Sequence, residues 1–513
     1  MAAFSAHDLR SIDTGSPESG EARVNPHAGK LNVLAEEMAK HGTRRIISPV
    51  ILEGLVRISE FLITIVAGAA TYWTQAYSGN GFIAETLLAV PLMAILITFT
   101  LQALGTYRLI ALRTIERSGP RLAAGWAGLF TLLYAALYVL HLGTAARYSW
   151  IVHWAVIGFV VLVAERCALF FITNALARSG KLSRRTAIVG GGPAAFQLLQ
   201  DLAEHGSGDL HITGIFDDRT DDRSPDVVAG FPKLGNIDDL VGFARNTPLD
   251  LVIFTLPISA EQRLLVMLRK LWVLPIDIRL AAHMNKLRFR PRAYSYIGAV
   301  PVIDVFDKPI ADWDIVVKNI FDRVAGLLCL ILAMPIMLLV ALAVKLDSPG
   351  PILFRQKRYG FNNEQIEVFK FRSMYSDKLD YSAAKTVTRN DPRVTRVGRF
   401  IRRSSFDELP QLFNVVFKGN LSLVGPRPHA IYAKAAGGLY DEVVDGYFAR
   451  HRVRPGITGW AQINGWRGET DTPEKIQKRV EHDLYYIENW SIFFDIYVLL
   501  ATPLSLITTK NAF

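Results

Sequence analysis

Two adjacent carboxylates, Asp407 and Glu408, stand out among the residues that could do chemistry. They follow the run Arg402-Arg403-Ser404-Ser405-Phe406 and precede Leu409-Pro410. Neighbours on a regular strand point to opposite faces, so the two groups could not work there as an opposed acid and base. At a helix start, however, both carboxylates could reach one metal ion or one phosphorus atom. We therefore predict that Asp407 and Glu408 are catalytic.

The acidic pair also fits a purely structural role. Ser404 or Ser405 could cap a helix that starts here, and Glu408 lies three residues after Ser405, as in a capping box. A carboxylate nucleophile, by contrast, needs cationic neighbours or a metal ion to keep it ionised. The two alternatives therefore differ in what must surround Asp407.

Basic residues near the acidic pair are candidates for phosphate binding. Arg427 lies between Pro426 and Pro428, which hold its guanidinium on a rigid mount. Arginine donates in a planar fork that matches phosphate oxygens, so several arginines around an acidic pair favour a diphosphate substrate. A basic surface resting on anionic lipid is the alternative for about half of them. The candidate phosphate-binding residues are Arg402, Arg403, Arg427, Lys370 and Arg372.

The composition of the chain indicates a membrane protein with several domains. Its 513 residues are 50% hydrophobic and 20% charged, whereas soluble chains carry about 25% charged residues. The mean hydropathy is +0.23 and the formal net charge is +10, so basic residues must crowd into the polar segments. Anionic lipid and phosphate-bearing substrates are the expected partners; nucleic acid is not, because it would not explain the apolar stretches. Cys167 and Cys329 predict no disulfide.

Four apolar stretches in the first third of the chain are each close to the roughly 20 residues that cross a bilayer as a helix. They predict a four-span bundle over residues 49–178, after a disordered cytoplasmic tail over 1–48. Positive charge gathers between the second and third stretches and after the fourth, which places both ends of the bundle in the cytoplasm. The stretches lie near 58–76, 83–105, 122–142 and 150–173, and the charges include Arg108, Arg113, Arg117, Arg121, Arg178 and Lys181.

The segment 186–305 has the strand, turn and helix pattern of a Rossmann-like, CoA-binding-like domain. Its glycine turn, Gly190 to Ala195, fits G-x-G-x-x-A between a strand and a helix. Asp217 lies near the distance expected for a ribose contact. We leave its nucleotide unassigned, because a regulatory or spacer domain that has lost its ligand is an equal alternative.

A single apolar run, Ala325 to Val344, follows with Pro335 at its centre. A straight span would move the rest of the chain across the membrane, yet the downstream segment is as basic as the upstream one. Proline removes an intrahelical hydrogen bond and bends a helix. We therefore predict a re-entrant membrane helix over 322–346, with a kinked fifth span as the alternative. The tail from Trp490 to Thr509 predicts an interfacial helix.

Five runs in the last third of the chain resemble the bacterial sugar transferase family, the monotopic polyprenyl-phosphate phosphoglycosyl transferases. The last of them is similar to the long, colanic-acid-type glucose-1-phosphate transferases. The resemblance implies a membrane protein of α plus α/β class, in which the four-helix bundle and the Rossmann-like domain precede a re-entrant-helix catalytic domain over residues 316–513. The runs are Lys370-Phe371-Arg372-Ser373-Met374, Asp407-Glu408-Leu409-Pro410-Gln411-Leu412, Gly425-Pro426-Arg427-Pro428, Pro455-Gly456-Ile457-Thr458-Gly459-Trp460 and Gly465-Trp466-Arg467-Gly468-Glu469-Thr470-Asp471.

The resemblance also implies a two-step exchange. Asp407 would attack the β-phosphate of a UDP-sugar, UMP would leave, and undecaprenyl phosphate would take the sugar phosphate from the enzyme. By the same carry-over, Asp407 and Glu408 place Mg²⁺, and Arg402 and Arg427 hold phosphate groups. The expected donor is UDP-glucose, with UDP-galactose as the alternative, and the product would start an exopolysaccharide or capsule repeat unit.

The family's setting is the bacterial inner membrane, where this chain is expected to be a multi-pass protein, with membrane lipid as a partner and a catalytic domain on the cytoplasmic face. A homodimer stays open. A membrane-bound nucleotide-sugar dehydratase is the rival enzyme, since Tyr381 and Lys385 spell Y-x-x-x-K, but no second glycine-rich strand, turn and helix precedes them. A noncatalytic membrane scaffold would not need the acidic pair.

Overall fold

The computed structural model divides the chain into two compact units, Arg44–Ser183 and a second that combines Met1–Thr43 with Arg184–Phe513. The predicted tail up to residue 46, Ala35 apart, and the Tyr381 to Lys385 pattern lie outside the described residues. The structure describes residues 35, 47–76, 84–141, 144–205, 210–219, 224–256, 260–281, 295–297, 300–376, 391–429, 434–435, 438–440, 444, 446–468 and 472–508.

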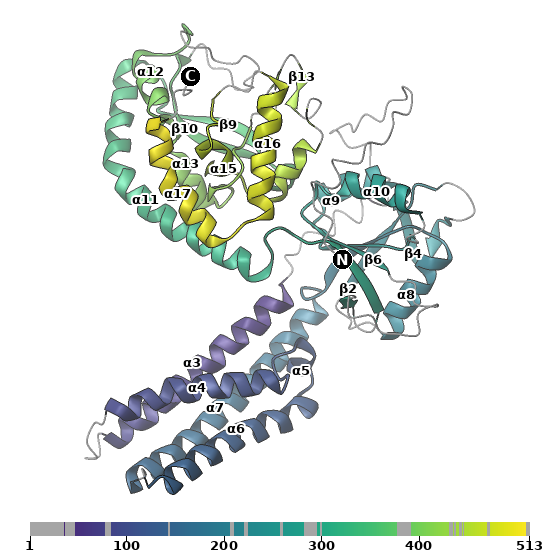
Figure 1. Cartoon of the computed structure of the whole chain (residues 1–513), viewed down its shortest axis with the longest axis vertical. Helices are drawn as coiled ribbons and strands as arrows, with labels where there is room; N and C mark the ends of the chain where they lie inside the picture. Colours follow the sequence, from purple (N-terminus) through teal and green to yellow (C-terminus); the bar gives the residue numbers. More distant parts are fainter. Residues whose placement is uncertain are drawn as a thin grey trace. The chain divides into compact units, whose positions relative to one another are not determined.

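The first unit is a bundle of helices in which α3 and α6 each pack against α4 and α7 (Figure 1). A Cβ atom at Gly68 would lie 2.7 Å from the ring of Trp154, and the indole of Trp154 donates to the carbonyl of Thr64 at 3.0 Å. Small residues at the contacts and satisfied polar groups are typical of helices that pack in a membrane. The helices are α3 (Pro49–Ala76), α4 (Ala84–Ala103), the short α5 (Leu109–Arg113), α6 (Ile115–Val139) and α7 (Ala145–Arg178).

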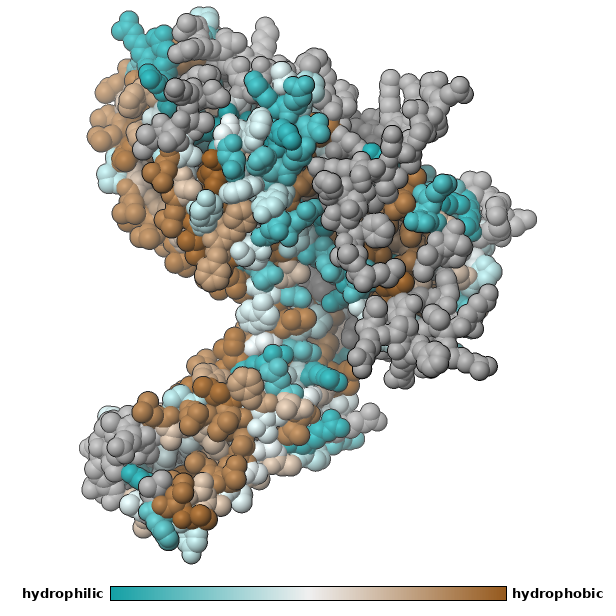
Figure 2. Space-filling view, in the orientation of Figure 1, coloured by the Kyte–Doolittle hydropathy of each residue, from teal (hydrophilic) through white to brown (hydrophobic). Residues whose placement is uncertain are grey.

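Three helices are long and apolar enough to cross a membrane, within the residues that the structure describes. They are Ser118–Val139 in α6, the whole of α7, and α11 (Asp312–Asp347) in the second unit. The apolar part of α4, Leu88–Ala103, is shorter. Figure 2 shows apolar side chains over much of the visible bundle surface. The chain is therefore a mixed α and β protein with helices suited to a bilayer.

The second unit begins with an eight-stranded sheet in the order β3-β4-β2-β1-β5-β6-β8-β7. The five strands from β4 to β6 in this order run parallel, and the edge strands β3, β8 and β7 pair antiparallel. Helix α8 packs on one face, and α9 and α10 pack on the other (Figure 1). This arrangement fits the predicted Rossmann-like pattern. The elements are β1 (Arg184–Val189), α8 (Pro193–His205), β2 (Leu210–Phe216), β3 (Val227–Val228), β4 (Phe231–Gly235), α9 (Ile237–Asn246), β5 (Leu251–Phe254), α10 (Glu261–Leu271), β6 (Asp277–Ala281), β7 (Ser295–Ile297) and β8 (Val300–Phe306).

The rest of the second unit is built around α11 and small two-stranded sheets. The strands β9 and β10 form a hairpin, and β11 pairs parallel with β14. The carboxyl-terminal helices α16 and α17 complete the core that includes Val340, Leu423 and Tyr486. After α11 the elements are β9 (Leu353–Tyr359), β10 (Gln365–Phe371), α12 (Arg396–Arg403), α13 (Gln411–Phe413), β11 (Ser422–Val424), β12 (Lys434–Ala435), β13 (Gly438–Leu439), β14 (Gly456–Thr458), α15 (Trp460–Ile463), α16 (Pro473–Glu488) and α17 (Ile492–Thr508).

Helix α11 is continuous through Pro335 and curves along one side of this fold (Figure 1). Near its start, Lys318 Nζ donates to Asp495 Oδ2 at 2.6 Å and to the carbonyl of Val424 at 3.0 Å. At its end, Arg372 Nη2 donates to the carbonyl of Ser348 at 2.8 Å. Both ends of α11 are therefore tied to the same fold. Between them lie exposed apolar side chains such as Leu332 and Leu339, and Figure 2 shows an apolar surface over α11 and α17.

Candidate active site

The acidic pair lies on a tight turn that α12 positions. The Thr395 side chain caps α12 by accepting from the N–H of Gly398 at 2.9 Å. After α12 the chain turns at Ser405, whose φ of 61° and ψ of 17° lie in the left-handed region. Non-glycine residues rarely adopt this conformation, and such backbone clusters at functional sites. A 3₁₀ turn, Phe406–Glu408, follows and carries both carboxylates.

Ser405 does not act as a helix cap. Its side chain makes no capping hydrogen bond, and its hydroxyl instead accepts from Nη2 of Arg467. The capping box that the sequence offered as an alternative is therefore wrong. The physical reason is that Ser405 is left-handed and a 3₁₀ turn rather than an α-helix follows it, so the geometry that a capping box needs is absent here.

Glu408 is held between two cations. Lys370 Nζ lies 2.9 Å from Oε1, and Arg427 Nη1 donates to Oε2 at 3.1 Å. A second donor of Arg427, Nη2, bonds Oε1, which makes the contact bidentate. Burial alone would raise the pKa of Glu408, but the charges of Arg427 and Lys370 outweigh burial and hold that pKa well below its usual value. Glu408 is therefore ionised and fixed at neutral pH.

Asp407 is the less restrained member of the pair. Its side chain is only 9% exposed, yet within the described residues it makes no hydrogen bond. Burial raises the pKa of Asp407 and the charge of Glu408 adds to this rise, while Lys370 and Arg402 oppose it. A buried carboxylate whose oxygens make no hydrogen bond among the described residues, with cations close by, has the surroundings that a carboxylate nucleophile needs.

The hairpin of β9 and β10 presents two cations to the acidic pair. Arg358 pairs with Ile366, and Phe354 pairs with Lys370. Because side chains alternate along a strand, Arg358 and Lys370 share one face of the hairpin. Arg358 Nη1 donates to the carbonyl of Pro428. Burial, with the charge of Arg427, lowers the pKa of Arg358 to about 10, so Arg358 stays charged at neutral pH.

A buried network anchors the backbone that carries Arg427. Arg450 Nη2 donates to the carbonyl of Arg427 at 2.7 Å and to Asp483 Oδ2 at 2.5 Å. The ring nitrogens of His429 lie 2.5 Å from Nη1 of Arg450 and 3.3 Å from Nη1 of Arg479. Burial and these two guanidinium groups hold the pKa of His429 well below its usual value, so its ring is neutral.

Positive charge exceeds negative charge in this region. The burial of Arg467 lowers its pKa, and its charge interacts with Arg427, Glu408 and Asp407. Buried charges are costly unless they are paired, so the excess of cations favours an anionic ligand. Phosphate groups match the guanidinium fork. The cations are Arg358, Lys370, Arg427, Arg450, Arg467 and Arg479, and the carboxylates are Asp407, Glu408 and Asp483.

The phosphate-binding residues predicted from the sequence do not all meet at the acidic pair. Lys370 and Arg427 contact Glu408. Arg402, half-buried, lowers the pKa of Asp407 through its charge. Arg403 is exposed on α12.

Arg372 lies with the end of α11 rather than with the carboxylates. Its guanidinium donates to the carbonyls of Val344, Ser348 and Pro349 at 3.4, 2.8 and 2.5 Å. The physical reason is that β10 ends at Phe371, so the alternation that places Lys370 at the site does not carry on to Arg372. Arg372 holds the helix end in place, and no phosphate role rests on these contacts.

Four cations of the site were not singled out from the sequence. Arg358 follows the alternating pattern of its strand, which could have placed it on the face of Lys370 once the hairpin was assumed. Arg467 lies in the run that resembles the colanic-acid-type enzymes. That run indicated the family but did not assign a function to Arg467. Arg450 and Arg479 have no local signal, because only the tertiary fold brings them to His429.

A divalent cation fits the acidic pair only with help from substrate. Within the part of the chain that the structure describes, no group of three or more His, Cys, Asp or Glu side chains could hold a metal. Mg²⁺ is commonly bound by one or two carboxylates together with substrate phosphates and waters. Asp407, which has no hydrogen bond among the described residues, fits that smaller donor set, whereas both oxygens of the neighbouring Glu408 are already bonded by Lys370 and Arg427.

The glycine turn of the Rossmann-like sheet uses its own carboxylate. The N–H of Gly191 donates to Asp217 Oδ2 at 2.7 Å, and the N–H of Arg219 donates to Oδ1 at 3.1 Å. Asp217 is buried. Asp217 therefore closes the turn from within, and this contact agrees with the alternative of a domain without a nucleotide.

Comparison with known proteins matches two family models to the chain, one over the catalytic fold and one that spans the end of the helical bundle and most of the Rossmann-like sheet. A bacterial sugar transferase family model matches residues 313–509, and a CoA-binding domain model matches residues 102–282. An undecaprenyl-phosphate glucose phosphotransferase of Komagataeibacter xylinus is 41% identical over 361 residues, which cover 70% of this chain and 66% of that protein. A UDP-glucose:undecaprenyl-phosphate glucose-1-phosphate transferase of Xanthomonas campestris pv. campestris is 32% identical over 467 residues, 90% of this chain and 94% of the relative.

A protein with the same printed function from Escherichia coli K12 is 37% identical over 360 residues, 70% of this chain and 75% of the relative. The similarity thus extends over most of both chains in the longest match and includes the acidic turn, the hairpin and Arg427. The chain belongs to the bacterial sugar transferase family.

Proposed function

We propose that this protein transfers glucose-1-phosphate from UDP-glucose to undecaprenyl phosphate and releases UMP. The observation that carries the proposal is the pairing of an unengaged, buried Asp407 with a Glu408 that Lys370 and Arg427 hold fixed. The printed functions of the relatives supply the substrates. Transfer of a hexose phosphate to a lipid phosphate would begin a repeat unit of an exopolysaccharide or capsule, as an exopolysaccharide production relative from Rhizobium leguminosarum also suggests.

Asp407 is the proposed nucleophile. Its carboxylate attacks the β-phosphorus of UDP-glucose, a new bond forms between Asp407 and phosphorus, and the bond to the bridging oxygen breaks so that UMP leaves. The phosphate of undecaprenyl phosphate then attacks the same phosphorus, and the carboxylate of Asp407 is regenerated. No oxidant or reductant is needed, and each step exchanges one phosphorus–oxygen bond for another.

The neighbouring charges orient the diphosphate and hold developing charge. Lys370 and Arg427 already place positive charge beside the acidic turn through Glu408, and Arg358 and Arg467 add guanidinium groups that phosphate oxygens can meet. Asp407, with Glu408 beside it, would hold Mg²⁺, and the ion would supply positive charge to neutralise the phosphate groups. Glu408 keeps Lys370 and Arg427 in position while Asp407 reacts.

The same proposal includes a place in the membrane. We propose that α11 enters and leaves the bilayer on one side, that the helices α3, α4, α6 and α7 cross it, and that the catalytic fold lies on the cytoplasmic face of the inner membrane. The attachment of both ends of α11 to one fold supports the first point. Basic residues near the ends of α4 and α7 support the orientation.

The decisive experiment measures UMP release by the purified full chain with Mg²⁺, UDP-glucose and undecaprenyl phosphate. Asp407→Asn should lower turnover by at least about 1,000-fold, as expected for loss of a covalent nucleophile. Asp391→Asn is the matched control, because Asp391 pairs with Arg393 on the approach to α12 and belongs to no catalytic contact described above.

Mass spectrometry of the enzyme after reaction with UDP-glucose alone should find hexose phosphate on Asp407. Turnover by Asp407→Asn equal to that of the control would reject the nucleophile. UDP-galactose, compared with UDP-glucose at equal concentration, tests the alternative donor, and a preference for galactose would overturn the glucose assignment.

A further inference from the structure

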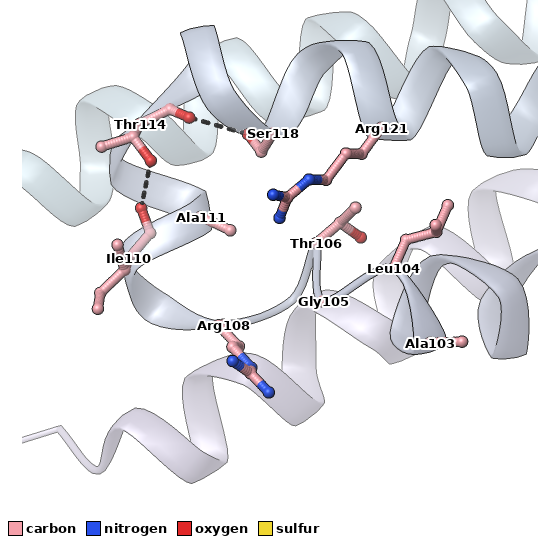
Figure 3. A pocket seen from close by; sticks show the side chains of 10 residues that line it. All are labelled: Ala103, Leu104, Gly105, Thr106, Arg108, Ile110, Ala111, Thr114, Ser118 and Arg121. Atoms are coloured by element: carbon pink, nitrogen blue, oxygen red, sulfur yellow. Dashed lines mark hydrogen bonds between the residues drawn. The ribbon is translucent and has the colours of Figure 1, made fainter.

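A cavity in the helical unit Arg44–Ser183 has no part in the proposed reaction. It has a volume of about 420 Å³ and lies where α4 ends, α5 follows and α6 begins. Thr106 lies at its edge, and Ala111 lines it from α5 (Figure 3). The cavity belongs to the end of the bundle at which basic residues gather, which the positive-inside rule assigns to the cytoplasm.

The cavity presents a cation without a counter-charge. Figure 3 shows the guanidinium of Arg121 reaching into the space between Ala111 and Thr106, whereas the side chain of Arg108 lies at the rim and points away. Within the described residues, neither guanidinium group has a hydrogen bond or an ion pair. None of the lining residues that the structure describes is acidic. Arg166, by contrast, pairs with Glu60 at 2.6 Å and is not available.

Hydroxyl groups that line the cavity already donate their hydrogen bonds to backbone carbonyls. Thr114 Oγ1 donates to the carbonyl of Ile110 at 2.7 Å, and Ser118 Oγ donates to the carbonyl of Thr114 at 3.1 Å (Figure 3). Among the described lining residues, the side-chain donor that reaches into the cavity and stays available to a ligand is therefore the guanidinium of Arg121, supported by the positive end of the α6 dipole. A ligand that matches this donor is an anion.

The walls of the cavity also contain apolar side chains whose exposure to water is unfavourable. Leu104 is 37% exposed and Ile110 is 59% exposed. Helix α6, which begins beside them, is apolar enough to cross a bilayer. A free anion would leave these surfaces in water, whereas a lipid would cover them with its chains while its phosphate meets Arg121.

We propose that this cavity binds the headgroup phosphate of an anionic phospholipid of the cytoplasmic leaflet, with the acyl chains along Leu104 and Ile110. Basic pockets between transmembrane helices on the cytoplasmic side commonly bind anionic lipid headgroups. Undecaprenyl phosphate resembles such a phospholipid in having both a phosphate group and an apolar chain, whereas inorganic phosphate has the negative charge alone. Both therefore serve as comparisons in the test.

Lipid in the cavity would brace the bundle. The carbonyl of Thr106 accepts from Arg166 Nη1 at 2.8 Å, and Arg166 bonds Glu60 of α3. A ligand that packs against Thr106 therefore contacts a turn that is hydrogen-bonded to Arg166 of α7 and, through it, linked to Glu60 of α3. Such a ligand should stabilise the packing of these helices. We expect phosphatidylglycerol to raise the melting temperature of the bundle as well as to bind.

The test is native mass spectrometry of the full chain in mild detergent, titrated with phosphatidylglycerol and with phosphatidylcholine of the same acyl chains. Phosphatidylglycerol should bind more tightly. Arg121→Gln should weaken that preference by about 5-fold, the effect of one basic residue near an anionic lipid surface. Ala111→Trp should abolish binding by filling the cavity without a change of charge. Arg178→Gln is the matched control, because Arg178 is an exposed basic residue that ends α7 outside the cavity.

Each arm has a result that would overturn the proposal. Equal binding of the two phospholipids would show that the cavity does not recognise negative charge. Displacement by inorganic phosphate would assign it to a soluble anion, and binding of undecaprenyl phosphate alone would assign it to the acceptor. If Arg178→Gln weakened binding as much as Arg121→Gln, the preference for phosphatidylglycerol would come from the overall positive charge of the surface and not from this cavity. Unchanged melting temperatures of the lipid-free variants exclude misfolding as the cause.

Discussion

Asp407 and Glu408 are adjacent residues whose pKa values shift in opposite directions. The same turn raises the pKa of Asp407 by burial and holds that of Glu408 well below its usual value, because Lys370 and Arg427 bond only Glu408. Paired titratable groups whose pKa values are pushed apart commonly have separate chemical roles. Here the difference matches a reactive carboxylate beside a structural one.

This difference predicts a pH dependence. Asp407 must be ionised to attack, so turnover should fall as the pH drops through its raised pKa. Lys370 opposes that rise, so Lys370→Met should move the acid limb of the pH–rate profile of kcat to higher pH. Lys418→Met is the matched control, since Lys418 lies over the ring of Phe369 and its head is 4.3 Å from the ring centre.

Profiles of kcat against pH for the two variants, at saturating UDP-glucose, make the comparison. An acid limb that stays in place in Lys370→Met, or that moves as far in the control, would contradict the electrostatic role of Lys370. A general loss of fold would lower the whole profile without moving its midpoint.

Among the elements, α11 and the hairpin of β9 and β10 bear on where the proposed chemistry lies relative to the membrane. An α-helix of the length of α11 would extend about 50 Å if straight, at 1.5 Å per residue, which exceeds the roughly 30 Å of hydrocarbon. The ties of Lys318 and Arg372 to one fold at both ends of α11 support the re-entrant path that we propose for this helix. Pro335 lies between those ties and removes one backbone hydrogen bond.

The re-entrant path that we propose for α11 predicts the side of the membrane on which the hairpin of β9 and β10 lies. In a chain that lacks Cys167 and Cys329, a cysteine at exposed Lys357 should react with an impermeant maleimide only after the inner membrane is opened. His141→Cys, at the end of α6 that the charge pattern places outside, should react without opening and is the positive control. Labelling of Lys357→Cys in intact spheroplasts would show that α11 crosses.

Pro335→Ala in the same background should lower turnover by about 10-fold or more, because small shifts of a reacting group cost rate steeply. Pro503→Ala is the control with a proline inside another apolar helix, α17. Equal activity of Pro335→Ala and the parent would mean that the curve of α11 does not depend on this proline.

The apolar helices and the parallel sheet pattern could be predicted from the sequence, because they depend on local signals, namely apolar runs and a glycine turn. The catalytic role of Asp407 and Glu408 stays a prediction. The sequence did not predict that Arg450 and Arg479 converge on His429, since those contacts join residues far apart in the chain. It placed Arg372 among phosphate ligands because composition cannot show that β10 ends at Phe371. The sequence suggested Ser405 as a helix cap because the residue type does not reveal that its backbone is left-handed.

At the scale of the whole second unit, the Rossmann-like sheet and the catalytic fold share a core. Trp272, which follows α10, packs in the core of the catalytic fold against Gly446. Arg452 Nη2 donates to the carbonyl of Asp307, and Asn362 Nδ2 donates to the carbonyl of Ala244, each at 3.0 Å. These contacts couple the stability of the sheet to that of the enzyme.

Trp272→Ala should therefore destabilise both folds together, by roughly 3–5 kcal/mol for a buried tryptophan. Thermal unfolding followed by intrinsic fluorescence and by loss of turnover should show one shared fall in midpoint. Tyr296→Ala is the control, because Tyr296 is an exposed aromatic residue at the edge of the same sheet. Turnover that survives beyond the unfolding of the sheet would show that the two folds are independent.

The tie between Lys318 and the strand before Arg427 has a practical consequence for anyone who wishes to work with a water-soluble fragment. Lys318 is the cation that meets Asp495 and the carbonyl of Val424, and Val424 is followed by the Gly425 to Arg427 run. A chain trimmed to begin after Asp347 would remove Lys318, so the buried carboxylate of Asp495 would lose its cation and the strand that leads to Arg427 would lose a donor to the Val424 carbonyl. Solubilisation of this enzyme therefore calls for replacing the exposed apolar face of α11 rather than deleting the helix.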